Sequence, residues 1–304
     1  MADNMLPTEL LEAIRSLYRR ARENALVTED ITSLADVRVD ETADFLERIY
    51  FNREEFDRHL GDFGKTYDIF RGFTADQTVL DVGAHWGYSA VAMRHQGCKS
   101  KIISIEALAT NVPSLMRLKS IDNGMYEFYN IAASETDRTI RFFIPVINGH
   151  ASTGLSTTGG TLGDDWAFLL AQLASRHKPL QGGVDEVRLA IADIPALPID
   201  TIADRVGPIV AVKMDVEGHE AHALQGAHRL LACEKPLLMV EGGNTDEQVV
   251  AQMVAHGYFY CERRDGKLAP HAERSVVHDG FWLHPEKVAF YRDLGIFDSA
   301  AEAG

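Results

Sequence analysis

The segment TVLDVGAHWGYSA, residues 78–90, constrains the fold more than any other stretch of this 304-residue chain. An apolar run ends at Asp81, Gly83 and Gly87 follow in a short loop, and a helical pattern then begins. Glycines at such a turn let the backbone approach a ligand that a side chain would keep away. The segment therefore predicts a strand, a cofactor-binding loop and a helix at the carboxyl edge of a parallel sheet.

The same alternation of short apolar runs and helical patterns continues along the chain, and it predicts an α/β fold. Continuous apolar strands indicate a mostly parallel sheet that is covered by helices on both faces. Thr245 or Asp246 is the expected cap of the last of these helices. The predicted strands are 101–107, 125–132, 209–215, 236–242, 258–263 and 280–285, and the predicted helices are 88–97, 111–124, 219–231 and 245–257.

Outside this core we expect an N-terminal helical extension over residues 1–74 and one larger domain over residues 75–304. The extension has an amphipathic pattern at 6–26 and a second helical stretch at 41–60 that ends near Gly61 and Gly64. The apolar stripe of the first helix packs on the protein's own core or on a homodimer partner. A Gly-, Ser- and Thr-rich insert at 148–186 with a helical pattern is interpreted as a lid or substrate segment rather than a plain crossover.

Composition excludes several classes of protein. Lys and Arg number 30 against 45 Asp and Glu, so the net charge is −15, the wrong sign for gripping a nucleic-acid backbone. No apolar run approaches the ~20 residues that span a bilayer, and the N-terminus lacks the pattern of a signal peptide. The three cysteines form no CxxC pair, which favours a cytoplasmic location without a disulfide framework.

The glycine spacing indicates which cofactor the loop binds. Nicotinamide sites use G-x-G-x-x-G, whereas here His85 and Trp86 stand between the glycines and leave less room for a pyrophosphate. Asp81 beside the loop suits a cationic ligand, and S-adenosylmethionine carries an ammonium and a sulfonium without a phosphate. Glu106 ends the next strand, where a carboxylate can hold both ribose hydroxyls. Asn130 ends the third strand and meets an adenine edge or simply forms a turn.

A second polar motif is VKMDVEGHE, residues 212–220. Lys213 and Asp215 share one strand face, and Glu217 and His219 follow at the strand's carboxyl end. Glu241, at the end of the neighbouring strand, extends the cluster. The five residues form either a structural ion-pair network or a catalytic group with displaced pKa values, in which Asp215, Glu217 or His219 is the general base.

Other chemistries fit this motif less well. These side chains include oxygen and nitrogen ligands for Mg²⁺, but we rank metal-free catalysis higher and predict no metal. The HEAH run at 219–222 is one residue too short for a zinc helix of the H-E-x-x-H type. The chain also lacks the serine-hydrolase elbow and the P-loop motif.

Taken together, VLDVGAHWGYSA, VAVKMDVEGHE and PLLMVEG resemble the FkbM family of S-adenosylmethionine-dependent methyltransferases over residues 75–262. The resemblance implies a Rossmann-like class I methyltransferase fold with a seven-stranded, mostly parallel sheet whose last strand is antiparallel. It also implies that Asp81, Gly83 and Gly87 line the methionine part of the cofactor, Glu106 the ribose and Asn130 the adenine. The full predicted cofactor set is Asp81, Gly83, Ala84, His85, Trp86, Gly87, Tyr88, Ser89, Glu106, Asn130 and Ala132.

One departure from the family concerns the cofactor loop. Members usually have Asn and an aliphatic residue where His85 and Trp86 stand, so this loop is stacked or gated differently. The resemblance does not reach the 148–186 insert or the N-terminal helices, which are expected to select the substrate.

We therefore expect an O-methyltransferase that acts on a sugar, a glycan or a polyketide-like natural product and that does not act on nucleic acid or insert into a membrane. An N-methyltransferase of a small molecule, a nicotinamide-dependent oxidoreductase and a cofactor-binding regulatory protein remain alternatives.

Overall fold

The computed structural model describes residues 42–147, 150–151, 156, 187–272, 274 and 279–298. The predicted helix at 6–26 and nearly all of the 148–186 insert lie outside the described residues. The chain divides into two compact units, a larger one of residues 41–140 and 194–304 and another that includes residues 141–193. None of the described helices is both long and apolar enough to cross a bilayer.

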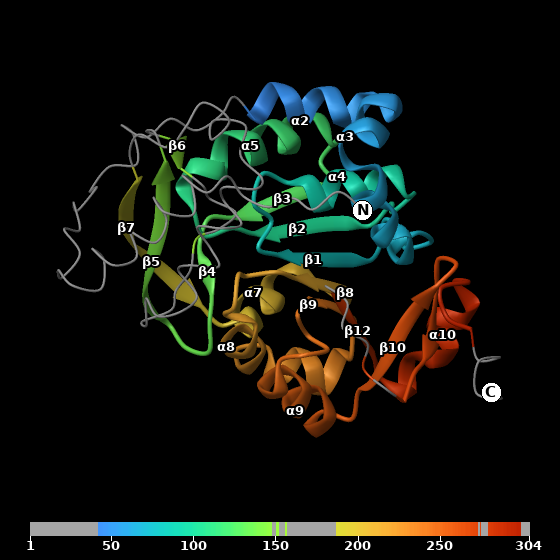
Figure 1. Ribbon diagram of the computed structural model, residues 1–304. Coiled ribbons are helices and arrows are strands. Elements are labelled where there is room, and N and C mark those ends of the chain that lie inside the picture. Colours follow the sequence, from blue (N-terminus) through green and yellow to red (C-terminus); the bar gives the residue numbers. More distant parts are fainter. Residues whose placement is uncertain are drawn as a thin grey trace, which may run out of the picture. The chain divides into compact units, whose positions relative to one another are not determined.

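The larger unit is built on an eight-stranded sheet with the order β11-β10-β12-β9-β8-β1-β2-β3 (Figure 1). The five neighbouring strands β3, β2, β1, β8 and β9 run parallel, and β12 is antiparallel to both of its neighbours, β9 and β10. This confirms the predicted Rossmann-like sheet and its antiparallel last strand. The strands are β1 (Thr78–Val82), β2 (Lys101–Ile105), β3 (Tyr126–Tyr129), β8 (Ile209–Met214), β9 (Leu237–Glu241), β10 (Phe259–Arg264), β11 (Lys267–Pro270) and β12 (Asp279–Leu283).

The sheet has eight strands instead of the seven expected, because β11 folds back on β10 as a hairpin. Asp265 and Gly266 connect the two strands with φ angles of 49° and 73°. Positive φ at both central residues is the geometry that Asp-Gly hairpin turns favour. The Asp-Gly pair was thus the sequence signal for the additional strand.

Alternate residues of the central strands enter two apolar clusters, one on each face of the sheet. Val79 and Ile102 belong to the first cluster, and their neighbours Leu80 and Ile103 belong to the second. Helices cover both faces, as predicted, with α2 to α5 on one side and α7 to α9 on the other (Figure 1). The described helices are α2 (Thr42–Phe51), α3 (Arg53–Lys65), α4 (Tyr88–His95), α5 (Val112–Ile121), α7 (Ile199–Val206), α8 (Glu220–Gln225), α9 (Glu247–Ala255) and α10 (Val288–Asp293).

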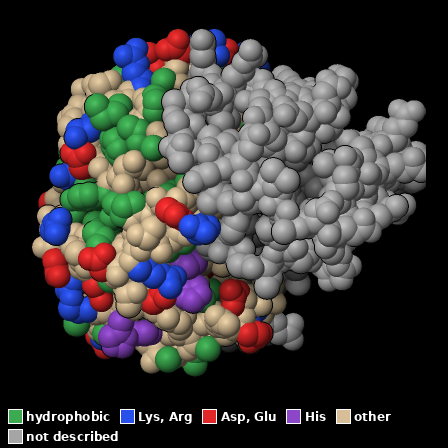
Figure 2. All heavy atoms as spheres, turned by 90° about the vertical axis from the view of Figure 1, so that its left-hand side faces the viewer, with side chains coloured by type: hydrophobic (Ala, Val, Ile, Leu, Met, Phe, Trp, Pro, Cys, Tyr) green, Lys and Arg blue, Asp and Glu red, His purple; other side chains and the backbone are tan. Residues whose placement is uncertain are grey.

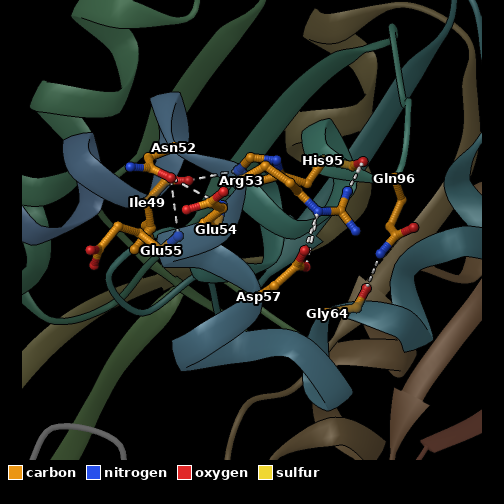
Figure 3. Close-up of polar contacts among 9 residues, drawn as sticks. All are labelled: Ile49, Asn52, Arg53, Glu54, Glu55, Asp57, Gly64, His95 and Gln96. Carbon is orange, nitrogen blue, oxygen red and sulfur yellow. Dashed lines mark hydrogen bonds and ion pairs between the residues drawn. The ribbon is translucent and has the colours of Figure 1, made fainter.

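The helical stretch expected at 41–60 forms two helices, α2 (Thr42–Phe51) and α3 (Arg53–Lys65), separated by Asn52. Asn52 caps α3 because its Oδ1 accepts hydrogen bonds from the amides of Glu54 and Glu55, at 3.0 and 3.1 Å (Figure 3). The helix runs past the expected last residue, Leu60, and ends at Lys65, directly after Gly64, so the expected end near the two glycines is confirmed at Gly64 and not at Gly61.

Polar contacts fasten these two helices to α4. Arg53 Nη1 donates to the His95 carbonyl at 2.9 Å, and Gln96 Nε2 donates to the Gly64 carbonyl at the same distance (Figure 3). His95 Nε2 lies 2.6 Å from the Ile49 carbonyl. The helices α2 and α3 thus pack on α4, the helix that follows the loop after β1, and these polar contacts lie at the C-terminal end of α4.

A second sheet, with the order β4-β7-β5-β6, was not predicted. Its strands are β4 (Ala132–Ala133), β5 (Arg138–Ile147), β6 (His150–Ala151) and β7 (Val187–Leu197). The boundary between the two compact units falls within β5 and β7. The predicted insert at 148–186 therefore lies between β5 and β7 in the sequence and contains β6 of this second sheet.

Candidate functional site

The polar residues of both sequence motifs meet at the carboxyl ends of β1, β2 and β8. The strand register sets Asp81 beside Ser104 on one side and beside Lys213 on the other. The carboxyl ends of parallel strands form one edge of the sheet, where ligands of such folds bind. The sheet thus brings together residues that are more than 100 positions apart in sequence.

Asp81 is fully buried, and its carboxylate ties three elements together. Its Oδ2 accepts hydrogen bonds from Ser89 Oγ at 2.6 Å and from Ser104 Oγ at 3.1 Å. Its Oδ1 lies 3.6 Å from Lys213 Nζ. Asp81 and Ser89, both predicted to bind the cofactor, thus hold β1, α4 and β2 in place around the loop.

The loop after β1 contacts the ends of both neighbouring strands, β2 and β8. The amides of Gly83 and Ala84 donate to the Ile105 carbonyl at 2.9 and 3.2 Å. Gly83 has a φ of 77°, and a Cβ there would lie 1.7 Å from the Asp215 carbonyl oxygen. This glycine is therefore required by the close approach of β1 to the end of β8, a reason that the sequence interpretation did not include.

His85, between the two glycines, also has a left-handed backbone, with a φ of 51°. His, like Asn and Asp, is several-fold enriched among non-glycine residues with a positive φ, so the loop accommodates His85 in this conformation. The His85 ring stacks on Trp86 with a centroid distance of 4.9 Å and an interplanar angle of 13°. Tyr88 lies next to Trp86, with ring centroids 5.3 Å apart. A Cβ on Gly87 would lie 3.0 Å from Leu118 Cδ2 of α5, so a glycine here leaves room for that side chain.

Burial dominates the electrostatics of His85 and lowers its pKa to about 4, although the Asp215 charge opposes this shift. The imidazole is thus neutral at pH 7. His85 is also the imidazole whose electrostatic interaction with Asp215 is evident, whereas the sequence analysis grouped His219 with Asp215.

Glu106 is buried at the end of β2 and held by three donors. The amides of His85 and Leu108 each donate to its carboxylate at 2.8 Å, and Asn111 Nδ2 donates at 3.0 Å. Burial raises the pKa of Glu106, and these hydrogen bonds oppose the shift. Asn111 was missed by the sequence analysis, although its place five residues after Glu106 was a usable signal.

Asn130 follows β3 and donates from Nδ2 to the carbonyls of Glu106 and Ala107, at 2.8 and 3.1 Å. It thereby fixes the backbone beside Glu106. Ala132 lies in β4, where it pairs with Ala196 of β7. Glu106 and Asn130 thus lie at the ends of neighbouring strands of the eight-stranded sheet, whereas Ala132 belongs to the second sheet.

Lys213 is buried at the centre of the second motif. Its Nζ donates to the Gly83 carbonyl at 2.8 Å and lies 3.4 Å from Asp215 Oδ2. Burial acts to lower the pKa of Lys213, but the charges of Asp215 and Asp81 outweigh it, and the net shift is upward. Lys213 therefore stays charged at pH 7, and its ammonium group contacts the Gly83 carbonyl and the Asp215 carboxylate.

Asp215 and Glu241 form a pair of side chains joined by a hydrogen bond. Burial, the hydrogen bond to Asp215 and the Asp215 charge raise the pKa of Glu241 to about 9. The pKa of Asp215 is lowered: burial acts to raise it, but the Lys213 charge and the hydrogen bonds from Glu241 and Lys213 outweigh that effect. At pH 7 the pair is therefore one carboxylate and one protonated carboxyl.

His219 belongs to a different group, with Ser134, Glu135, His222 and Arg138. Ser134 Oγ donates to Glu135 Oε2 at 2.5 Å, so its contact of 3.1 Å with His219 Nε2 requires the proton to lie on that nitrogen. The His219 ring stacks on His222 at 4.6 Å. Figure 2 shows histidine side chains among Lys, Arg, Asp and Glu side chains on the face that lies at the left of Figure 1.

Burial lowers the pKa of His219 to about 4, and the nearby charges of His222 and Arg138 act in the same direction. The structure thus separates the five residues proposed for catalysis. Lys213, Asp215 and Glu241 lie together, whereas His219 contacts the group around Ser134.

Glu217 has a left-handed backbone with a φ of 54°, and its charge raises the pKa of Glu241. Beside it, Glu220 accepts hydrogen bonds from the amides of Val216 and Gly218, at 2.9 and 3.3 Å. Glu217 thus lies in the turn between β8 and α8, next to the carboxyl pair. Among the described residues, no group of three or more His, Cys, Asp or Glu side chains has the arrangement of a metal site.

Tyr67 and Asp279 also lie near this site, and the sequence analysis missed both. Tyr67 is buried in a short 3₁₀ turn, η2 (Thr66–Phe70), and its pKa is raised by burial and altered by the charges of Lys213 and Asp81. Asp279 begins β12 directly opposite Glu241. No sequence motif surrounds either residue, so only the fold could have identified them.

Comparison with known families finds one matching model, the methyltransferase FkbM domain, over residues 81–260. No curated protein matches the sequence. Among solved structures, methyltransferase FkbM from Methylobacillus flagellatus KT is 19% identical, with a TM-score of 0.42 over 70% of this chain and 44% of its own. The chain thus spans less than half of that protein.

Two other similar structures are described as O-methyltransferases. One, from Bacillus cereus in complex with SAH, is 11% identical, with a TM-score of 0.34 over 92% of each chain. The other is TomG from Streptomyces achromogenes, involved in tomaymycin synthesis and solved in complex with SAM. It is 15% identical, with a TM-score of 0.32 over 87% of this chain and 96% of its own.

Proposed function

The chain belongs to the FkbM methyltransferase family, and on that premise we propose that it transfers a methyl group to a hydroxyl oxygen of a sugar, a glycan or a polyketide-like natural product. The observation that carries the proposal is the ionised Asp215 at the carboxyl edge of the sheet, fixed between charged Lys213 and protonated Glu241.

The cofactor is S-adenosylmethionine, which supplies a methyl group on a positively charged sulfur. Two observations support the fit of this edge to an adenosine. Glu106 Oε2 accepts a hydrogen bond from the His85 amide and, as a carboxylate oxygen, has capacity for a further donor such as a ribose hydroxyl. Asn111 Oδ1, beside it, is buried without a hydrogen-bond partner.

Asp215 is the group best suited to accept the proton of an alcohol. Its side chain is 33% exposed, whereas the Lys213 side chain is 5% exposed. Lys213 cannot act as the base because it stays charged, and Glu241 cannot because it already carries a proton at pH 7. A fixed carboxylate at the end of β8 can both orient a hydroxyl and remove its proton as the oxygen takes the methyl group.

The net charge of −15 favours a neutral or cationic acceptor over a nucleic acid. Because the FkbM match covers the glycine loop itself, we do not retain the nicotinamide-dependent oxidoreductase. An amine acceptor remains the second option, and the chemistry of the product distinguishes it from an alcohol.

The test is to incubate the protein with S-adenosylmethionine carrying a ¹³C-labelled methyl group and a panel of sugars, oligosaccharides, hydroxylated macrolactones and their amine analogues. NMR of the products identifies the atom that receives the label. We expect an O-methyl product, and a methyl group found only on nitrogen would contradict the proposal.

The role of Asp215 is tested in the same assay. General bases contribute about 10²–10⁴-fold to rate, so Asp215→Asn should lower kcat by that factor while cofactor binding persists. Asp204→Asn is the control, because Asp204 is an exposed carboxylate paired with Arg229 away from the site. Full turnover by Asp215→Asn would remove this residue from the role of base.

A further inference from the structure

Glu241 and Asp215 occupy adjoining strand ends. Met214, the last residue of β8, pairs with Val240 of β9. The residues that follow these two are Asp215 and Glu241, so their carboxyl groups lie side by side. The side chains are joined by a hydrogen bond, and Lys213 Nζ lies 3.4 Å from Asp215 Oδ2. Two carboxyl groups can share a hydrogen bond only when one of them keeps a proton.

The surrounding charges decide which of the two keeps it. Glu241 faces the charges of Glu217 and Glu220 from the turn after β8 and stands opposite Asp279 of β12. Asp215 instead lies next to the Lys213 cation. Ionisation of Glu241 would add a negative charge among acids, whereas Asp215 is stabilised as a carboxylate.

We propose that Glu241 is a positioning residue, whose protonated carboxyl donates a hydrogen bond to Asp215 and so fixes the orientation and basicity of that carboxylate. This inference rests on the proposed function, because it assigns a role in the same proton transfer. The acceptor O–H proton passes to Asp215 as the oxygen–methyl bond forms and the methyl–sulfur bond breaks, with the electron pair left on sulfur. Glu241 keeps its own proton throughout.

Glutamine separates positioning from charge, because its amide can still donate a hydrogen bond but cannot ionise. Glu241→Gln should therefore preserve the interaction with Asp215, and Glu241→Ala should remove it. Glu247→Gln is the control, because Glu247 of α9 is an exposed carboxylate that pairs with Arg274.

The first readout needs no acceptor. In protein with ¹³C-labelled Glu and Asp carboxyl groups, NMR follows the titration of both residues, with assignments from Glu241→Gln and Asp215→Asn. We expect Glu241 to be protonated at pH 7. Loss of its hydrogen bond should raise the titration midpoint of Asp215 in Glu241→Ala but not in Glu241→Gln. A Glu241 that is ionised at pH 7, or an Asp215 midpoint that is equal in all variants, would overturn the inference.

The second readout is the pH profile of methyl transfer to an acceptor from the panel. We expect the acidic limb of kcat/KM to move to higher pH in Glu241→Ala and to stay in place in Glu241→Gln and Glu247→Gln. Wild-type protein without methyl transfer to oxygen would contradict the proposed function but would leave the NMR result intact. Wild-type transfer with an unchanged profile in Glu241→Ala would contradict the positioning role alone.

Discussion

Replacing Lys213 by Met tests whether one buried cation holds the site together. Met preserves much of the apolar stem but leaves Asp81, which is fully buried, and part-exposed Asp215 without their shared positive charge. Breaking a buried ion pair by removing one partner costs about 3–5 kcal/mol. Because Asp81 keeps hydrogen bonds from Ser89 and Ser104, we expect the lower end of this range.

Urea denaturation at pH 7 measures the loss, and a double-mutant cycle with Asp81→Asn identifies its cause. Asn at position 81 removes the orphaned charge, so the double variant should lose less stability than the sum of the two single variants. A loss below about 1 kcal/mol in Lys213→Met, typical of an exposed ion pair, would refute the view that the Lys213 charge is essential to the fold.

Three further predictions concern stability. Gly83→Ala should destabilise the protein by more than the ~1–2 kcal/mol that a left-handed backbone costs a residue with a side chain, because the new Cβ would meet the Asp215 carbonyl. Denaturant titrations measure the loss. The control Gly97→Ala, with a φ of 96° and no neighbour within 4 Å of the new Cβ, should show the backbone cost alone. Because the pKa of Glu241 is raised, its contribution to the free energy of unfolding is fully present below the ordinary pKa of 4.5 and is lost as the pH rises to about 9. Glu241→Gln should therefore flatten the fall of the unfolding free energy over this pH range, and a slope equal to that of the wild type would contradict the prediction. Because the pKa of His219 is lowered, its contribution to the free energy of unfolding is present above pH 6.5 and is lost as the pH falls towards about 4. His219→Gln should therefore reduce the difference between the unfolding free energies at pH 7 and pH 4. Equal differences in both proteins would show that His219 is not buried in its neutral form.

The strands and helices of the central sheet could be predicted because apolar runs and helical patterns there are local signals. Asp246, for example, caps α9 as expected, with its side chain accepting from the amides of Gln248 and Val249. The break at Asn52 was missed because the apolar pattern continues across it, and only the cap geometry separates α2 from α3. The second sheet was missed because it depends on β7, whose Ala196 pairs with Ala132 of β4, 64 positions earlier in the sequence.

That residues of the two polar motifs lie close together was also predictable, because the carboxyl ends of parallel strands lie at one edge of a sheet. Lys213, Asp215 and Glu241 lie together for that reason. The direction of His219 was not predictable, because it depends on Ser134, a residue 85 positions earlier that only the fold brings near. His85 shows the same limit: the sequence places it in the loop, but its electrostatic influence on Asp215 depends on how β1 approaches β8.

The most direct test of the account is a calorimetric titration of the protein with S-adenosylmethionine, beside Glu106→Ala and the control Glu127→Ala on the neighbouring strand. Glu127 pairs with Lys119 at the surface, so its loss leaves the carboxyl edge of the sheet intact. Thermal unfolding confirms that each variant is folded. We predict saturable binding to wild type and Glu127→Ala, and none to Glu106→Ala. Equal binding to folded Glu106→Ala, or binding of NADH in place of S-adenosylmethionine, would contradict the site described here.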